Sequence, residues 1–194
     1  MPEGKEKMDI LGLLRLQAAN HILANLRLGR ACAQLPDEAF FAPRPCFFGS
    51  IHATLDHLVV TDRRYLERID GTPHPPTDGD GVEYQSRDEL ADARRAVDMR
   101  LRDLMSGLTP ADMDKPILLH DTERYGRQVD PLWLILQHVF AHATHHRGQV
   151  HDLLSQTDVK PPQLDEFILS MDVPFRRDEV AEAGVGEWMI EGPG

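Results

Sequence analysis

The chain has 194 residues, of which 41 % are hydrophobic, and a formal net charge of −11, which predicts a single folded domain over residues 1–194. A surface this acidic repels phosphate backbones and anionic lipids, so we expect no nucleic acid and no membrane as partner. No apolar run reaches the roughly 18–20 residues of a membrane span, and MPEGKEKMDI lacks the apolar stretch of a signal peptide, so we expect a cytoplasmic protein.

The first third of the chain is expected to form two long helices. Apolar residues recur at three- and four-residue spacing over residues 8–35, and Pro36 ends the pattern. Residues 36–48 are expected to form a loop because they contain several prolines. Ser50 can then N-cap a second helix that continues to Ile69 and ends near Gly71.

The middle of the chain is expected to hold a third helix and a region of different pattern. Ser86 and Glu89 have the spacing of a capping box, which opens a helix that runs to about Ser106. Residues 116–129 lose the helical spacing, which indicates a short hairpin or an extended loop. The two cysteines, Cys32 and Cys46, are too few for a disulfide framework, and we expect structural thiols.

A fourth helix is expected to start with Asp130 as N-cap and Pro131 as the first helical residue, and to run to about Gln156. The tail, residues 158–194, is expected to carry short helices, one of them over residues 164–171, and to fray at its end. Four amphipathic helices with little strand signal predict an all-α fold, a four-helix bundle with its core over residues 8–157. Its long connections favour a crossover between helices.

The fourth helix carries half of the ten histidines: His138, His142, His145, His146 and His151. At 100° per residue, His142 and His146 fall on its aliphatic stripe, whereas His145 and His151 fall outside it. Their i, i+4 spacing lets two imidazoles share one metal ion. The same spacing also occurs in helices where histidines only bond to neighbouring helices. Position 143 is alanine, so there is no HExxH protease motif.

Three further residues of this helix have alternative interpretations. Gln149 can hydrogen-bond to a metal-binding histidine without contacting the ion itself. Arg147 can bind an acidic group or a substrate carboxylate, or it is a solvated surface arginine. His138 is a partly buried helix histidine or an additional group at the site. Gly148 disfavours helix by about 1 kcal/mol relative to alanine, for which a close helix–helix approach is the expected reason.

Several strings resemble one known family. HVFAHATHHRGQVHDLL is similar to the signature helix of DinB/YfiT-like proteins, and FFGSIHATLDHLVVTDRRYLERIDG resembles their second helix. AANHILANLRL is similar to their first helix, with Asn20 at a recurrent asparagine position, and KPPQLDEF to a segment that follows the signature helix. The resemblance covers roughly residues 8–168. It implies a four-helix bundle that binds a metal ion through three histidines, one on the second helix and two on the fourth.

Carried over by position, this ligand set is His57, His142 and His146. The apolar periodicity of the second helix does not choose between His57 and His52, since both lie off the centre of its aliphatic stripe. The resemblance selects His57 through its place in TLDHL.

Three histidines leave coordination positions for water or substrate and accept zinc, nickel or iron(II). The resemblance includes thiol-dependent S-transferases and a mycothiol-dependent isomerase. It implies a metal-dependent enzyme that activates a low-molecular-weight thiol and acts on a small molecule. A metal-dependent hydrolase and a non-catalytic, stress-associated metal-binding protein are the alternatives. The general base is unassigned; Asp62 and Tyr65 are candidates that have packing roles as alternatives. Homodimers occur among related bundles and are expected here.

Overall fold

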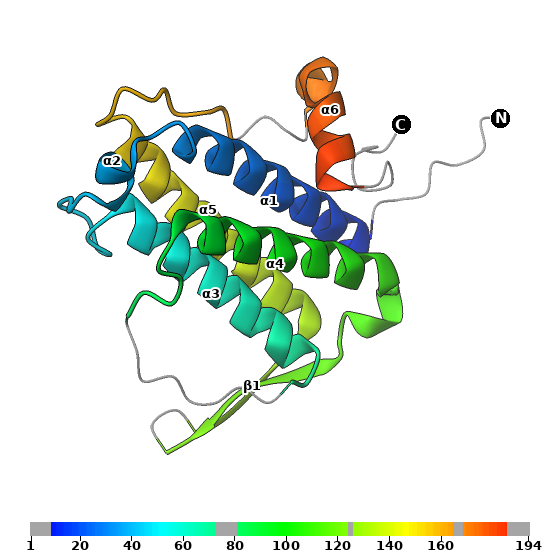
Figure 1. Ribbon diagram of the computed structural model, residues 1–194. Helices are drawn as coiled ribbons and strands as arrows, with labels where there is room; N and C mark the ends of the chain where they lie inside the picture. The colour runs from blue at the N-terminus through cyan, green and yellow to red at the C-terminus, as the bar shows by residue number, and fades with distance from the viewer. Residues whose placement is uncertain (1–8, 73–80, 124–125, 165–168, 186–194) are drawn as a thin grey trace.

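The computed structural model describes residues 9–72, 81–123, 126–164 and 169–185. Most of these residues are helical, and the body of the protein consists of four long helices (Figure 1). These are α1 (Ile10–Cys32), α3 (Ile51–Ile69), α4 (Arg87–Gly107) and α5 (Leu132–Leu154). None of the helices described has an apolar stretch long enough to cross a membrane.

Side-chain caps start α3 and α4 where the sequence predicts them. The Ala53 amide donates to Ser50 Oγ at 2.9 Å, which satisfies one of the free amides at the start of α3. At the start of α4, the Glu89 amide donates to Ser86 Oγ, and the Ser86 amide donates to the Glu89 carboxylate. The predicted capping box is therefore present.

The start of α5 differs from the prediction. Asp130 belongs to a β-strand and pairs with Ile117, so its backbone is extended and its side chain does not cap the helix. Pro131 is the N-cap, without a side-chain hydrogen bond. Carbonyl groups from the preceding segment replace that bond: the Leu132 amide donates to Lys115 and the Trp133 amide to Met113. The helix ends at Leu154 rather than at Gln156.

Other boundaries also differ from the sequence expectation. The first helix covers Ile10–Cys32, and residues 33–35 form a turn. The expected loop over residues 36–48 contains a short helix, α2 (Asp37–Phe41), because the buried ring of Phe40 anchors it to the core. Of the expected tail helix, residues 165–168 lie outside the described residues, as does the end that was expected to fray. The tail helix of the structure is α6 (Val173–Ala183), after a 3-10 turn at Ser170–Asp172.

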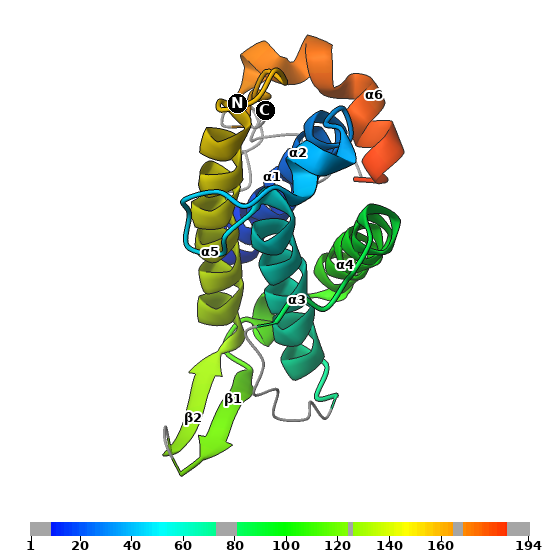
Figure 2. The same ribbon diagram turned by 60° about the vertical axis from the view of Figure 1, so that its left-hand side comes forward.

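The four long helices form a bundle in which α1 and α3 occupy opposite corners. Each of them packs against both α4 and α5, as Figures 1 and 2 show from two sides. The connections from α1 to α3 and from α4 to α5 therefore cross the bundle, as the long connections predict. Short α2 packs against α3, and α6 packs against α1.

The segment between α4 and α5 is a hairpin. Strands β1 (Pro116–Thr122) and β2 (Gly126–Pro131) pair antiparallel, with an irregularity between Leu118 and His120. The hairpin extends beyond the end of the bundle and contacts α3 and α5 at its base (Figure 2). The pairing of Pro116 with Pro131 fixes where the chain enters α5.

The centre of the bundle is polar. Six buried or nearly buried side chains from all four long helices meet there: His21, Asn25, Asp62, Arg94, Asp98 and Arg147. Arg94 binds Asp62 at 2.6 Å and Asp98 at 2.7 Å. Two arginines thus face two carboxylates, so the buried formal charges of this network cancel.

His21 links the two halves of this network. Arg147 has only donors, so its contact with His21 Nδ1 at 3.2 Å requires an unprotonated Nδ1. The proton of the neutral ring then lies on Nε2, which is 3.2 Å from Asp62. Burial lowers the pKa of His21 in spite of the nearby Asp62, which favours the neutral form of the ring.

Gly148 does not lie at a close helix–helix approach, contrary to the sequence expectation. It is exposed, and a Cβ at this position would have no atom within 4 Å.

We therefore expect Gly148→Ala to raise the free energy of unfolding by up to about 1 kcal/mol, because alanine favours helix. Urea denaturation measures the change. Gly184→Ala should have the opposite sign, because φ is +62° there and the new Cβ would lie 2.6 Å from Arg102 Nη1. Equal effects from the two changes would contradict this account.

Candidate metal centre

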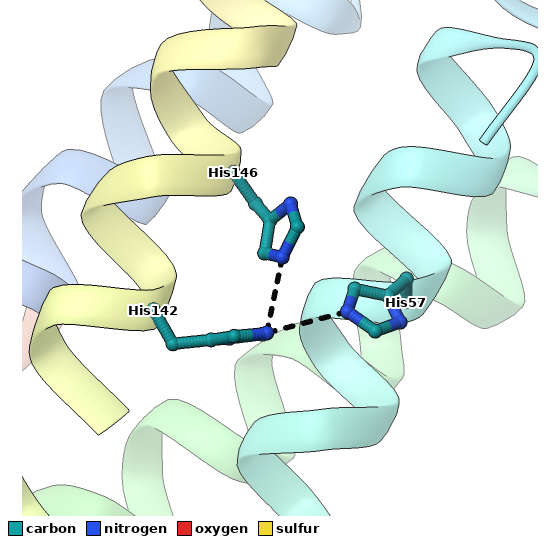
Figure 3. A group of neighbouring side chains, drawn as sticks. All are labelled: His57, His142 and His146. Atoms are coloured by element: carbon teal, nitrogen blue, oxygen red, sulfur yellow. Dashed lines mark hydrogen bonds between the residues drawn. The ribbon is translucent and has the colours of Figure 1, made fainter. Parts of the chain in front are cut away.

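Three histidine side chains meet between α3 and α5. His57 comes from α3, and His142 and His146 come from successive turns of α5. The two helices run antiparallel, since Tyr65 on α3 lies beside His138 while His57 lies beside His142 and His146. Figure 3 shows the three rings directed toward one shared space. His146 is buried, and the other two are partly exposed.

The ring nitrogens lie at distances that suit one ion. His142 Nε2 is 3.0 Å from His146 Nε2 and 3.3 Å from His57 Nε2, and the ligand atoms of all three residues lie within 4.8 Å of one another. A tetrahedral zinc with bonds of about 2.0–2.1 Å places its nitrogen ligands roughly 3.3–3.4 Å apart. If all three Nε2 atoms are unprotonated, their lone pairs at these distances repel one another unless a cation lies between them. The donor set therefore fits a divalent ion.

Gln149 orients His146. Its Oε1 lies 2.8 Å from His146 Nδ1, so the ring proton is on Nδ1 and the Nε2 lone pair faces the other two histidines. The amide nitrogen of Gln149 donates to His145 Nε2 at 3.2 Å, which holds the amide in this orientation. The expected role of Gln149 beside a metal-binding histidine is thus consistent with the structure.

An aromatic ring supports the cluster on its other side. Phe48 stacks on His57 with the ring centres 4.2 Å apart, and it meets His146 edge-on. The loop that carries Phe48 leads into the Ser50 cap of α3, so the position of this ring is tied to the start of the helix. Sequence reasoning did not find Phe48, because nothing in a loop pattern reveals which ring folds back over a site.

The environment lowers the pKa of two of the histidines, His142 and His57. The pKa of His142 is lowered to about 4 by its burial and then by the adjacent His146 and His57. Burial also lowers the pKa of His57, with further contributions from His146 and the charge of Arg64. Because only a neutral imidazole binds a metal, we expect protons to compete with an ion at His142 only as the pH approaches 4.

His52, the alternative to His57, has a different environment. It is buried at the start of α3 between the rings of Phe40 and Phe41, and its Nε2 lies 2.9 Å from the Tyr84 carbonyl oxygen. Asp56 accepts hydrogen bonds from the Tyr84 amide at 2.8 Å and from the Glu83 amide. These α3 side chains fix the segment that leads into α4, and His52 is not part of the cluster.

The remaining candidates lie near the cluster or in the bundle centre. His138 is exposed, one turn before His142, with the ring centres 5.9 Å apart. Arg147 is not a solvated surface residue: it is 4 % exposed, and its guanidinium contacts His21 and Asn25 in the bundle centre rather than the three clustered histidines. The interpretation of Arg147 as a surface residue is wrong because α5 packs against α1 as well as α3, so both of these faces of the helix are covered.

The two candidate bases have structural contacts. Asp62 is 2 % exposed and ion-paired with Arg94 in the bundle centre. Tyr65 is half-buried beside His138, and its pKa is raised by burial. The general base therefore stays unassigned.

A cavity of about 690 Å³ lies on the side of α3 that faces away from the histidines. Leu55, Leu58 and Val59 form its α3 wall, with mostly apolar residues of α1 and both charged and apolar residues of α4 opposite. Because none of the three histidines lines it, we assign it no part in the metal chemistry.

The geometry defines a class of protein: a helical bundle with three imidazoles that converge between two helices. The DinB family model matches residues 16–173, and the chain belongs to the DinB family. Its structure is similar to that of a DinB-like protein from Bacillus cereus, with a TM-score of 0.56 and 20 % identity, over 72 % of this chain and 89 % of that chain. That likeness shows the fold alone. No curated protein matches the chain.

The contact between Gln149 and His146 gives a direct test of the site. We expect Gln149→Leu to weaken zinc affinity by about 10–100-fold, because His146 loses the acceptor that fixes its proton on Nδ1. Competition with a chromogenic chelator measures the affinity. Gln137→Leu is the matched control, since Gln137 is exposed on the same helix. Equal zinc affinities for the two variants would show that Gln149 does not orient a ligand.

Proposed function

We propose that this DinB family protein binds one divalent ion, zinc, nickel or iron(II), through His57, His142 and His146 and catalyses transfer of a low-molecular-weight thiol to a small-molecule substrate. The observation that carries the proposal is the open ligand set. Among the described residues, the cluster contains three histidines and no fourth ligand from cysteine or a carboxylate. Structural zinc sites are closed by four protein ligands, whereas catalytic sites keep a position free.

The ion would supply a positive charge that lowers the pKa of a thiol and so favours the thiolate. The protein residues hold that charge in place. Gln149 fixes the tautomer of His146, and Phe48 packs against His57 to restrict the ring. The partial exposure of His57 and His142 leaves the ion accessible from solvent.

The residues around the cluster favour thiol chemistry over hydrolysis. A bound metal ion lowers the pKa of its water from 15.7 to about 7, but a metal-dependent hydrolase commonly adds a general acid or base that moves the protons of water and leaving group. A free thiol has a pKa near 8.5 and needs little further help. No carboxylate belongs to the cluster in the described part of the chain, and Asp62 is occupied by its ion pair with Arg94.

A thiol screen tests the proposal. Protein loaded separately with zinc, nickel or iron(II) is incubated with glutathione, bacillithiol or mycothiol and an electrophile, and the conjugate is quantified. We expect turnover with at least one thiol, and its loss in His142→Ala. Absence of turnover with every thiol and metal would contradict the proposal and favour hydrolysis or non-catalytic metal binding.

A further inference from the structure

Arg64, for which the described part of the chain offers no partner, lies on the same face of α3 as His57. Arg64 follows His57 by seven residues, which is close to two full turns, so both side chains lie on the helix face that borders α5. Helical side chains lean toward the N-terminus of their helix, and a long arginine side chain on this face therefore extends back toward His57. Its charge influences the His57 ring, which is consistent with this placement.

The guanidinium of Arg64 has no acceptor among the residues that the structure describes. Its Nε is buried, and neither this atom nor the rest of the group makes a hydrogen bond or ion pair with any described residue. The adjacent arginines differ: Arg63 binds Glu83, and Arg68 donates to the Leu119 carbonyl. A buried donor without an acceptor costs free energy, and a ligand with an anionic oxygen group would remove that cost.

Among the described residues, the carboxylates whose charges act on the His57 ring already have partners: Asp56 accepts hydrogen bonds from the Glu83 and Tyr84 amides, and Asp62 pairs with Arg94. On α3, Glu67 lies 3.6 Å from Arg63. On α5, the residues that contact α3 beside the cluster are histidines, His138 against Tyr65 and His142 and His146 against His57, and none carries a negative charge. In a protein with a net charge of −11, the seam between α3 and α5 is therefore a place where an anion meets little repulsion.

Resting on the proposed function, we propose that Arg64 is a specificity-determining residue of the metal centre. It binds the anionic oxygen group, such as a carboxylate, of the thiol or substrate whose sulfur is held at His57, His142 and His146. The preferred ligands are small acids with a thiol at the other end. From the sequence, Arg147 was one candidate for binding a substrate carboxylate. The structure places Arg147 in the bundle centre, and Arg64 is the arginine beside the cluster.

Cobalt(II)-loaded protein tests this assignment. Thiol binding is followed by the sulfur-to-cobalt charge-transfer absorption, with 3-mercaptopropionate and its neutral counterpart 3-mercaptopropionamide as probes. We expect wild-type protein to bind the acid about tenfold more tightly than the amide or better, from a charge-assisted contact. In Arg64→Gln the ratio should fall to near one, and Arg64→Lys should retain part of it.

Arg177→Gln, which removes an equal charge from an exposed position on α6, is the control and should keep the wild-type ratio. If both probes bind the cobalt equally in wild-type protein, or if Arg64→Gln keeps the preference, Arg64 does not recognise the acid, although the proposed thiol chemistry stands.

If neither probe gives a charge-transfer band, the proposed thiol chemistry is wrong. Arg64 is then judged with propionate alone, by ligand-observed NMR on the same proteins. Weaker propionate binding in Arg64→Gln than in Arg177→Gln would support the anion site, and equal binding would overturn it.

Discussion

Asp62→Ala is expected to lower the free energy of unfolding by about 3–5 kcal/mol, the usual loss when one partner of a buried ion pair is removed. Asp62 is 2 % exposed, and its carboxylate binds Arg94 at 2.6 Å and lies 3.2 Å from His21. Without it, two buried arginines face one carboxylate, Asp98. Urea denaturation followed by circular dichroism measures the loss.

An exposed aspartate provides the control for this prediction. Asp92 pairs with Arg95 at 2.8 Å, but both side chains are more than two-thirds exposed. Asp92→Ala should therefore cost less than about 1 kcal/mol. If Asp62→Ala does not fold, Asp62→Asn keeps the shape of the side chain and removes only the charge. A loss from Asp62→Asn no larger than that from Asp92→Ala would contradict the importance of this network.

The contribution of Asp62 should also depend on pH. Burial alone would raise its pKa, but the contacts with His21 and Arg94 outweigh burial and hold the pKa at about 2, against an ordinary value of 3.8. The unfolded chain therefore takes up a proton more readily, so this stabilisation is present above about pH 4 and is lost as the pH falls toward 2. We expect the stability difference between wild type and Asp62→Asn to shrink over this range. A difference that stays constant down to pH 2 would exclude this mechanism.

His142→Ala is expected to abolish stoichiometric metal binding. His142 Nε2 is the nitrogen that both other ligands approach, at 3.0 and 3.3 Å, and its removal leaves only two imidazoles. We expect zinc affinity to fall by more than about 100-fold. This loss exceeds the one expected for Gln149→Leu, which removes only a hydrogen-bond partner of His146. Elemental analysis of purified protein and a chelator competition measure the loss.

The neighbouring histidines serve as controls for His142. His138 and His145 are exposed on the same helix, and neither belongs to the cluster, so His138→Ala and His145→Ala should retain the ion. Added zinc should raise the melting temperature of wild type and of both controls, because binding favours the folded state. It should leave that of His142→Ala unchanged. Equal metal content in all four proteins would show that the three histidines are not the binding site.

Much of the fold follows from local sequence. The Ser50 and Ser86 caps need only a hydroxyl at the right distance from the first free amides, and the helix faces need only the 3.6-residue period. The spacing of His142 and His146 likewise determines that both rings lie on one face of α5. The family resemblance supplied His57, and the structure brings that residue to the other two. That the three bind an ion stays a prediction.

Tertiary structure decided the features that depend on both faces of a helix. Helix α3 packs against α5 on one side and α4 on the other, so apolar periodicity could not distinguish His57, which faces the cluster, from His52, which fixes the segment before α4. The same packing turns Asp62 and Arg147 inward. Each of them has partners on another helix, Arg94 on α4 for Asp62 and His21 and Asn25 on α1 for Arg147, which a pattern along one helix cannot reveal. The first amides of α5 donate to the carbonyl groups of Lys115 and Met113. These residues lie more than ten positions before the helix, so the residues next to Asp130 could not predict this cap. The sequence alone determined the four long helices and the shared face of His142 and His146, because those depend on near neighbours along the chain. The position of His57 beside the other two histidines, the charged centre of the bundle and the surroundings of Arg64 depend on residues that only folding brings together.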